Sequence, residues 1–179
     1  MKSREGTEWI SVPVGRRTDR TIDEVKLPED NKWRTKHCRQ IQAIYARAEH
    51  FSTLEDLVFP IICDLEITSL SQLNRKLIVE ICSFLGIETI FTDSRELSAS
   101  GDRVSKLIDI CEKVDAQTYL SGPAAKNYIG EEFEETEIEL RWAEYGPYSE
   151  YFQYGGAFDN HVSIVDLIAH TGLEASNLI

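Results

Sequence analysis

Apolar positions recur along the chain with two different spacings, one helical and one typical of strands. The clearest helical pattern covers residues 70–85, where apolar residues three and four positions apart form one stripe. Ser69 and Gln72 have the spacing of a capping box at its start, and Gly86 ends it. Further helices are predicted over residues 33–48, 52–64, 102–115 and 163–171.

Two of these helices carry additional signals at their starts. Ser52 and Glu55 have the capping-box spacing, and Pro60 predicts that this helix is short or kinked. Ser163 and Asp166 have a similar spacing at the start of the last helix, which favours a cap over a catalytic pair.

Runs rich in β-branched and aromatic residues predict strands. Residues 9–14 and 21–27 are two such runs, and the charged stretch 15–20 between them suits a hairpin-like connection. Pro13 lacks an amide hydrogen, so it places the first strand at a sheet edge or ends it there. An exposed edge is open to a partner, and we expect a homodimer through it.

Three further strands are predicted over residues 87–92, 117–120 and 138–142. The helix over residues 102–115 lies between the first two, which is the arrangement of a parallel βαβ unit with a right-handed crossover. We therefore expect an α/β fold, with a small sheet that contains a parallel βαβ unit and is flanked by helices. No repeat or low-complexity linker is visible, so one domain over residues 1–179 is expected.

The charge balance changes the set of expected partners. Lys and Arg number 19 against 31 Asp and Glu, giving a net charge of -12. Such a chain is repelled by phosphate backbones and anionic bilayers, and no apolar run approaches the ~20 residues that span a membrane. Nucleic acid and membrane insertion are therefore not expected. Residues 1–8 contain no apolar signal region, so a cytoplasmic location is expected.

The four cysteines give no metal or disulfide pattern. They are widely separated and form no CxxC pair, so we interpret them as buried, reduced thiols and expect neither a metal nor another cofactor. The residues concerned are Cys38, Cys63, Cys82 and Cys111.

Several short runs together resemble the WbqC-like family of bacterial surface-polysaccharide gene clusters. In order, they are Trp9-Ile-Ser-Val-Pro-Val14, Trp33-Arg-Thr-Lys-His37, Ile44-Tyr45, Leu73-Asn74, Leu85-Gly86-Ile87, Tyr119-Leu120-Ser121-Gly122 and Ser163-Ile-Val-Asp166-Leu. The resemblance implies a role in making O-antigen, as part of lipopolysaccharide, or a related glycan. It also implies a transferase that acts on a sugar or acyl donor. The alternative is a non-catalytic partner or assembly protein of the same pathway.

The chain departs from the family pattern at its start. Members of the family usually begin with an aromatic- and proline-rich segment around a Gln-Pro-x-Tyr-x-Pro motif, ahead of the run that corresponds to residues 9–14. The resemblance therefore implies a domain that is N-terminally truncated relative to the family. If the missing segment holds part of an active site, this chain is incomplete alone.

The predicted βαβ unit places the candidate ligand site. Ligands of open α/β sheets bind beyond the carboxyl ends of parallel strands, which indicates Ser94, Ser121 and Gly122. Pro123 starts a short helix there, and its free amides, with Lys126 close by, suit a phosphate or carboxylate. Tyr128 ends this helix and joins the candidate site. The expected ligand is an anionic small molecule, possibly nucleotide-linked, and the alternative is an ordinary tight turn.

Other candidates for chemistry lie outside this turn. His37 and Asp166 are the candidate catalytic residues, although a lone histidine on an apolar helix face is often a core residue. Asn74 shares an apolar face and is expected to be held in a buried hydrogen-bond network. Gln153 lies in an aromatic cluster that suits either stacking on a sugar or nucleobase, or packing as a lid or oligomer surface. The cluster consists of Tyr145, Tyr148, Tyr151, Phe152 and Tyr154.

Overall fold

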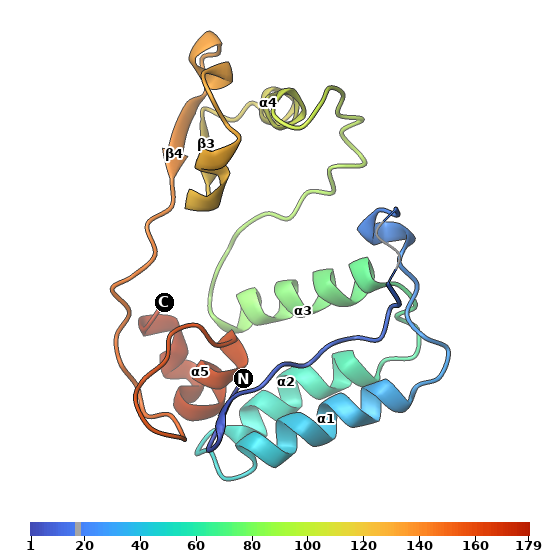
Figure 1. Ribbon diagram of the computed structural model, residues 1–179, viewed down its shortest axis with the longest axis vertical. Coiled ribbons are helices and arrows are strands. Elements are labelled where there is room, and N and C mark those ends of the chain that lie inside the picture. The colour runs from blue at the N-terminus through green and yellow to red at the C-terminus, as the bar shows by residue number, and fades with distance from the viewer. Residues whose placement is uncertain (17–18) are drawn as a thin grey trace. The chain divides into compact units, whose positions relative to one another are not determined.

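The computed structural model describes residues 1–16 and 19–179, which form two compact units. Unit 1 combines Met1–Thr89 with Tyr148–Ile179, and unit 2 is Ile90–Pro147. Figure 1 shows the elements of each unit, and each unit encloses its own cluster of buried apolar side chains.

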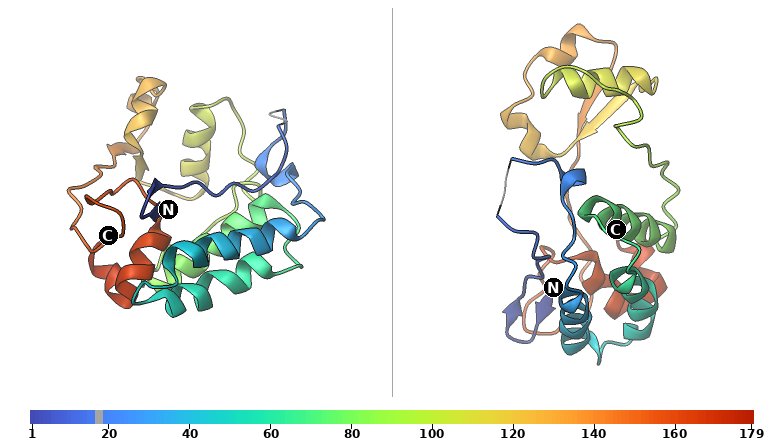
Figure 2. Two further views of the ribbon diagram at one scale, coloured as in Figure 1. Left: turned by 60° about the horizontal axis from the view of Figure 1, so that its bottom comes forward. Right: turned by 90° about the vertical axis from the view of Figure 1, so that its right-hand side faces the viewer.

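Unit 1 is built mainly from helices. They are α1 (Lys32–Tyr45), α2 (Phe51–Cys63), α3 (Leu70–Phe84) and α5 (Ile164–Thr171), with the 3-10 helix η4 (Gly172–Asn177) after α5. Helix α2 is central, because it packs against α1, α3 and α5. Figure 2 shows α1 and α2 side by side. The apolar stripes read from the sequence meet in this core, which includes Trp33, Ile41, Tyr45, Leu54, Val58, Leu73 and Ile168.

The helix starts distinguish a real cap from a chance spacing. At α3, the Gln72 amide donates to Ser69 Oγ and the Ser69 amide donates to Gln72 Oε1, both at 3.2 Å, so the predicted capping box is confirmed. At α2 the cap residue is His50, and Ser52 lies inside the helix. The predicted Ser52 box is therefore wrong. The helix continues through Pro60 to Cys63.

The two strands predicted near the N-terminus do not form. A short antiparallel pair occurs earlier, between β1 (Lys2–Ser3) and β2 (Gly6–Thr7). Residues 9–14 contain no strand, because Ile10 and Val12 pack against the helical core instead of forming a sheet. Residues 17–18 of the predicted connection lie outside the described residues.

The second predicted N-terminal strand, residues 21–27, contains instead the 3-10 helix η1 (Ile22–Glu24). Its last residues bond to the start of α3: the Leu27 amide donates to the Thr68 carbonyl and the Leu70 amide to the Val25 carbonyl, both at 2.9 Å. The predicted hairpin pair is therefore absent. The homodimer expected through its edge stays a prediction without that strand.

Unit 2 contains the parallel strands. Its elements are α4 (Ser105–Lys113), β3 (Thr118–Ser121), η2 (Pro123–Asn127), η3 (Glu132–Glu135) and β4 (Glu139–Trp142). Strand β3 pairs in parallel with β4, and Ser121 lies opposite Trp142. A mixed α/β fold with a small parallel pair and flanking helices is thus confirmed.

The partner of β3 differs from the one expected. Residues 87–92 form no strand, and the Ile90 side chain is 90% exposed. The chain runs from β3 to its partner β4 through η2 and η3, and α4 lies before both strands. The predicted βαβ unit from residue 87 to residue 121 is therefore wrong, because β-rich composition reports a preference and does not supply a neighbouring strand.

The two serine spacings at α2 and α3 make a matched test of capping. Ser69→Ala removes an N-cap acceptor and should lower the free energy of unfolding by about 1 kcal/mol. Ser52→Ala replaces an exposed residue inside α2 and should leave it unchanged or slightly higher. Urea denaturation measures both, and equal losses would contradict the assigned helix starts.

Candidate functional site

A buried carboxylate organises one end of unit 1. Asp166, on α5, is 0% exposed and accepts three hydrogen bonds. Tyr45 Oη donates at 2.7 Å, Tyr151 Oη at 2.8 Å and Gln153 Nε2 at 2.9 Å. Both oxygens of the carboxyl group therefore have donors from other side chains. The donors come from α1 and from the segment before α5, so one carboxylate joins three parts of the chain.

The two tyrosines are held as hydrogen-bond donors. Burial raises the pKa of Tyr45 and Tyr151 above the ordinary value, and the neighbouring charge of Asp166 raises both further. Both phenols therefore stay protonated at neutral pH. His170 also belongs to this cluster, because its Nδ1 lies 2.8 Å from the Asp166 carbonyl and its ring packs against Tyr154.

The Asp166 network extends to the N-terminal hairpin. Lys2 is 4% exposed, and its Nζ donates to Gln153 Oε1 at 3.2 Å and to the Ala157 carbonyl. The Lys2 amide donates to Tyr45 Oη at 3.2 Å. These bonds fix β1 against α1 and against the segment that carries Gln153. The same segment approaches the hairpin so closely at Gly155 that a Cβ would lie 2.3 Å from the Ser3 carbonyl oxygen.

A hollow of about 760 Å³, here termed the basic cavity, lies beside this anchored hairpin. Three arginines line it, Arg4 after β1 and Arg39 and Arg47 in and after α1, together with Tyr154. The Arg4 guanidinium carbon lies 5.6 Å from the centre of the Tyr154 ring. Within the described residues, none of the three arginines has an ion-pair partner. Glu5 and Glu8 also line the cavity.

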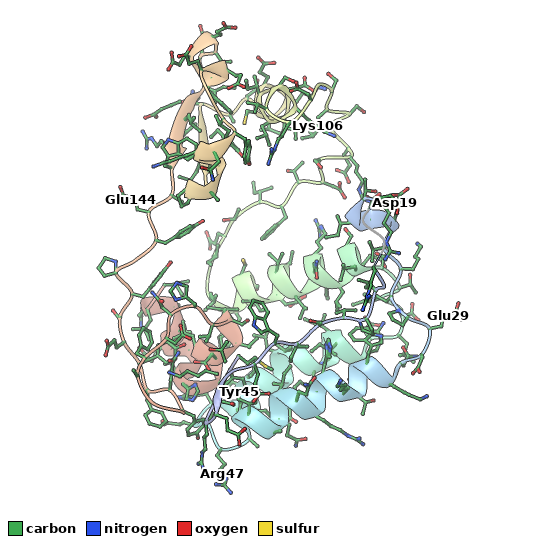
Figure 3. All side chains as sticks on the ribbon, in the orientation of Figure 1. Asp19, Glu29, Tyr45, Arg47, Lys106 and Glu144 are labelled. Carbon is green, nitrogen blue, oxygen red and sulfur yellow. The ribbon has the colours of Figure 1, made fainter. Side chains whose placement is uncertain are left out.

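Figure 3 labels Tyr45, the last residue of α1, and Arg47, two residues beyond it, and the two side chains point in different directions. Tyr45 is fully buried and belongs to the Asp166 network, whereas Arg47 is exposed and projects away from the helices. One end of α1 therefore contributes both to the buried network and to the basic cavity.

The structure brings two of the predicted site residues together. Gln153 and Asp166 are in direct contact through the 2.9 Å hydrogen bond. Because Asp166 is enclosed, the geometry gives it a positioning role, and its catalytic role stays a prediction. Ser163 caps α5 alone: it accepts from the Val165 amide, and Asp166 points into the core, so the predicted Ser163 and Asp166 box is wrong.

His37 lies apart from that pair, in the wall of a second cavity of unit 1. Its Nε2 is 3.2 Å from the Ser11 carbonyl oxygen, and burial lowers the pKa of its ring. His37 is therefore neutral at pH 7. With Nε2 donating to Ser11, the proton-accepting nitrogen is Nδ1.

The turn predicted as an anion site lies in unit 2. Ser121 is buried, and its carbonyl accepts from the Ala143 amide at 2.8 Å. Gly122 precedes η2, which is a 3-10 helix of five residues. Such a run lacks the aligned peptides that give an α-helix its N-terminal charge. The expected helix N-terminus is therefore absent, and ligand binding by Ser121 and Gly122 stays a prediction.

The neighbouring candidates make ring contacts within unit 2. Lys126 Nζ lies 5.3 Å from the centre of the Trp142 ring, and the Arg103 guanidinium lies 3.6 Å from that of Tyr128. Ser94 is in an exposed loop and does not follow a strand, because residues 87–92 are not one. The strand-end argument for Ser94 is therefore wrong.

Sequence reasoning did not select Lys2, Tyr45 or the three arginines of the basic cavity. A signal for the arginines exists: residues 32–48 contain five Lys or Arg and no Asp or Glu, in a strongly acidic chain. Lys2 and Tyr45 carry no such signal, since their roles depend on contacts with residues more than a hundred positions away.

The cysteines are free, but they are not all buried. Cys63 is exposed, and its Sγ lies 3.6 Å from that of Cys38. Burial is the main cause that raises the pKa of Cys38 to about 12, and the contact with Cys63 adds to the effect, so the Cys38 thiol is protonated at neutral pH.

Among the described residues, no group of three or more His, Cys, Asp or Glu is placed to hold a metal ion. No described helix combines the length and apolar character needed to cross a bilayer.

Comparison with known proteins shows the family. The model of the WbqC-like protein family matches residues 1–178. The chain belongs to this family. A relative in Mycobacterium tuberculosis (strain ATCC 25618 / H37Rv), named "Uncharacterized protein Rv1507c", is 35% identical over 182 residues, which cover 100% of this chain and 78% of the relative. No solved structure matches this WbqC-like protein.

The Asp166 network predicts a specific cost in this WbqC-like protein. Tyr45→Phe removes one donor and leaves a buried carboxylate oxygen unpaired, which should lower the free energy of unfolding by about 1–3 kcal/mol. Tyr148→Phe removes an exposed hydroxyl and should change it by less than about 0.5 kcal/mol. Chemical denaturation of both variants is the measurement, and a Tyr45 variant as stable as the control would contradict the network.

Proposed function

We propose that this WbqC-like protein acts in the synthesis of O-antigen or a related bacterial surface glycan, as a transferase-like protein that binds an anionic small molecule. The pathway is the one implied by the family. The binding role is supported by one observation in unit 1, the three arginines without ion-pair partners around the basic cavity.

The charge of the chain makes this cavity unusual. In a protein with a net charge of -12, most of the surface repels anions, so a hollow lined by three arginines against two glutamates, Glu5 and Glu8, is a local exception. Guanidinium groups bind phosphate and carboxylate oxygens through paired, charge-assisted hydrogen bonds. An anion in this cavity would supply the partners that Arg4, Arg39 and Arg47 lack.

The remaining wall suits a ligand with a ring attached to its charged group. Tyr154 presents an aromatic side chain at the cavity, and its position is fixed by contacts with Phe152 and His170. Aromatic faces stack on sugars and nucleobases. A nucleotide-linked sugar combines a diphosphate with a nucleobase and sugar rings, and it is the donor class that we assign to this site.

His37 remains the candidate base of a transfer, although it lines the second cavity of unit 1 and not the basic cavity. Burial keeps its imidazole neutral at pH 7, and Nδ1 has no hydrogen-bond partner within the described residues. A neutral imidazole with one available nitrogen accepts a proton from an attacking hydroxyl or amine.

Calorimetry with uridine diphosphate tests the binding role. We expect saturable binding that weakens with added salt, and Arg39→Ala and Arg47→Ala should each reduce the affinity by about tenfold, as loss of a charge-assisted bond predicts. Arg75→Ala, which changes an exposed arginine of α3 outside the cavity, should have no effect.

The uncharged nucleoside uridine is the matched ligand control. Equal affinities for uridine and uridine diphosphate, or undiminished binding by the Arg39 and Arg47 variants, would contradict an anion site at the basic cavity.

A further inference from the structure

A second cavity of unit 1, here termed the apolar cavity, has a volume of about 550 Å³. Its walls come from the N-terminal segment up to Val12, from helices α1, α2 and α3, and from residues before and at the start of α5. Most of the lining side chains are aliphatic or aromatic, including Ile41, Val58, Ile62, Leu73, Leu77 and Ile81. A hollow of this size with mainly apolar walls and a few polar groups has the composition of a small-molecule site.

Asn74 is the polar group in this wall that the fold itself does not use. The sequence predicts a buried amide within a hydrogen-bond network, and that prediction is wrong. Asn74 is half-buried, and its side-chain amide has no hydrogen-bond partner within the described residues. A side-chain amide at an apolar surface carries two donors and an acceptor that require partners.

Trp33 lines the same wall with its ring. Its side chain is buried, and its Nε1–H is enclosed without a hydrogen-bond partner among the described residues, so it is not presented to a ligand. Helix α1 contributes to this wall the Trp33 ring and, one turn later, the neutral ring of His37, which packs edge-on against Trp33. The Nε2–H of His37 is taken by the Ser11 carbonyl, so a ligand in this cavity would depend on the side-chain amide of Asn74 for a hydrogen-bond donor.

The charge of the lining residues selects the class of ligand. Among the described residues, no lysine or arginine side chain lines the apolar cavity; Glu8 does, as does Met1, whose N-terminal ammonium donates to the Glu8 carbonyl. An anionic headgroup is therefore disfavoured here, in contrast to the basic cavity. The remaining chemistry is an aliphatic group that ends in an uncharged acceptor oxygen.

We propose that the apolar cavity binds an aliphatic acyl group, with its carbonyl oxygen accepting a hydrogen bond from the Asn74 side-chain amide and its chain packed among Val58, Leu77 and Ile81. This acyl site stands on its own observations and does not rest on the anion site. It names a second chemical group, an uncharged acyl amide or ester, that this protein recognises.

Titration of the whole protein with a series of primary amides from butanamide to octanamide tests the acyl site. Trp9 and Trp33 line the cavity, so their fluorescence reports occupancy alongside calorimetry. Binding should be saturable, and the affinity should rise about fourfold for each added methylene. Octanoate, with the same chain and a negative charge, should bind more weakly than octanamide.

Two variants separate the acyl site from general hydrophobic binding. Asn74→Leu removes the amide from a half-buried position and should weaken octanamide binding by about five- to tenfold. Leu77→Trp fills the cavity and should abolish binding, while Asn127→Leu, at an exposed position of unit 2, should leave it unchanged.

The acyl site is overturned if octanamide shows no saturable binding, if the affinity does not depend on chain length, or if the Asn74 variant binds octanamide as tightly as the unchanged protein. The Arg39→Ala variant should bind octanamide normally, so failure at one cavity is distinguishable from failure at the other.

Discussion

A buried carboxyl group needs hydrogen-bond donors to replace the water that it has lost, and in unit 1 this requirement falls on Asp166. The carboxylate cannot be satisfied by its own helix. Its donors are Tyr45 and two residues of the segment before α5. Three pieces of chain, α1, the segment before α5 and α5 itself, are therefore joined at one side chain, and removing a donor leaves a buried polar group without its partner.

The consequences of this network reach both cavities. Gln153 accepts from Lys2, and Lys2 in turn donates its amide to Tyr45, so the N-terminal hairpin is fixed by groups that already bind Asp166. The residues that follow Lys2 enter the walls of the basic cavity, and the chain beyond β2 enters those of the apolar cavity. Glu8 lines both. The buried carboxylate thus supports two sites of opposite character without contacting a ligand in either.

The sequence was informative where structure follows from local pattern. Helical spacing located the helices of unit 1, because a helix with an apolar stripe on one face buries that face against the core. The capping box at Ser69 and the cap at Ser163 were equally local. Strand partners were not predictable in this way: residues 87–92 have strand composition, yet β3 pairs with β4. A strand is defined by a neighbour, and the composition of the run does not specify that neighbour.

For the candidate site, too, the sequence indicated individual residues but not the contacts between distant ones. Gln153 and Asp166 were selected separately by residue type, and their contact emerged only from the fold. Lys2 and Tyr45 were not selected, since a buried lysine and a core tyrosine look ordinary in sequence. Asn74 was predicted to be satisfied within the core and instead lines a cavity without a partner. Distant contacts, which sequence pattern does not encode one residue at a time, decided each of these outcomes.

Native-state hydrogen exchange of Asp166→Asn tests most directly whether this carboxylate fixes the hairpin and the Gln153 segment. Asparagine keeps the size of the side chain but lacks the charge and one acceptor oxygen. The account predicts faster exchange of amides in residues 1–8 and 151–159, with protection in α2 and α3 lowered much less. Unchanged exchange in those two segments, or an equal loss of protection throughout unit 1, would contradict it.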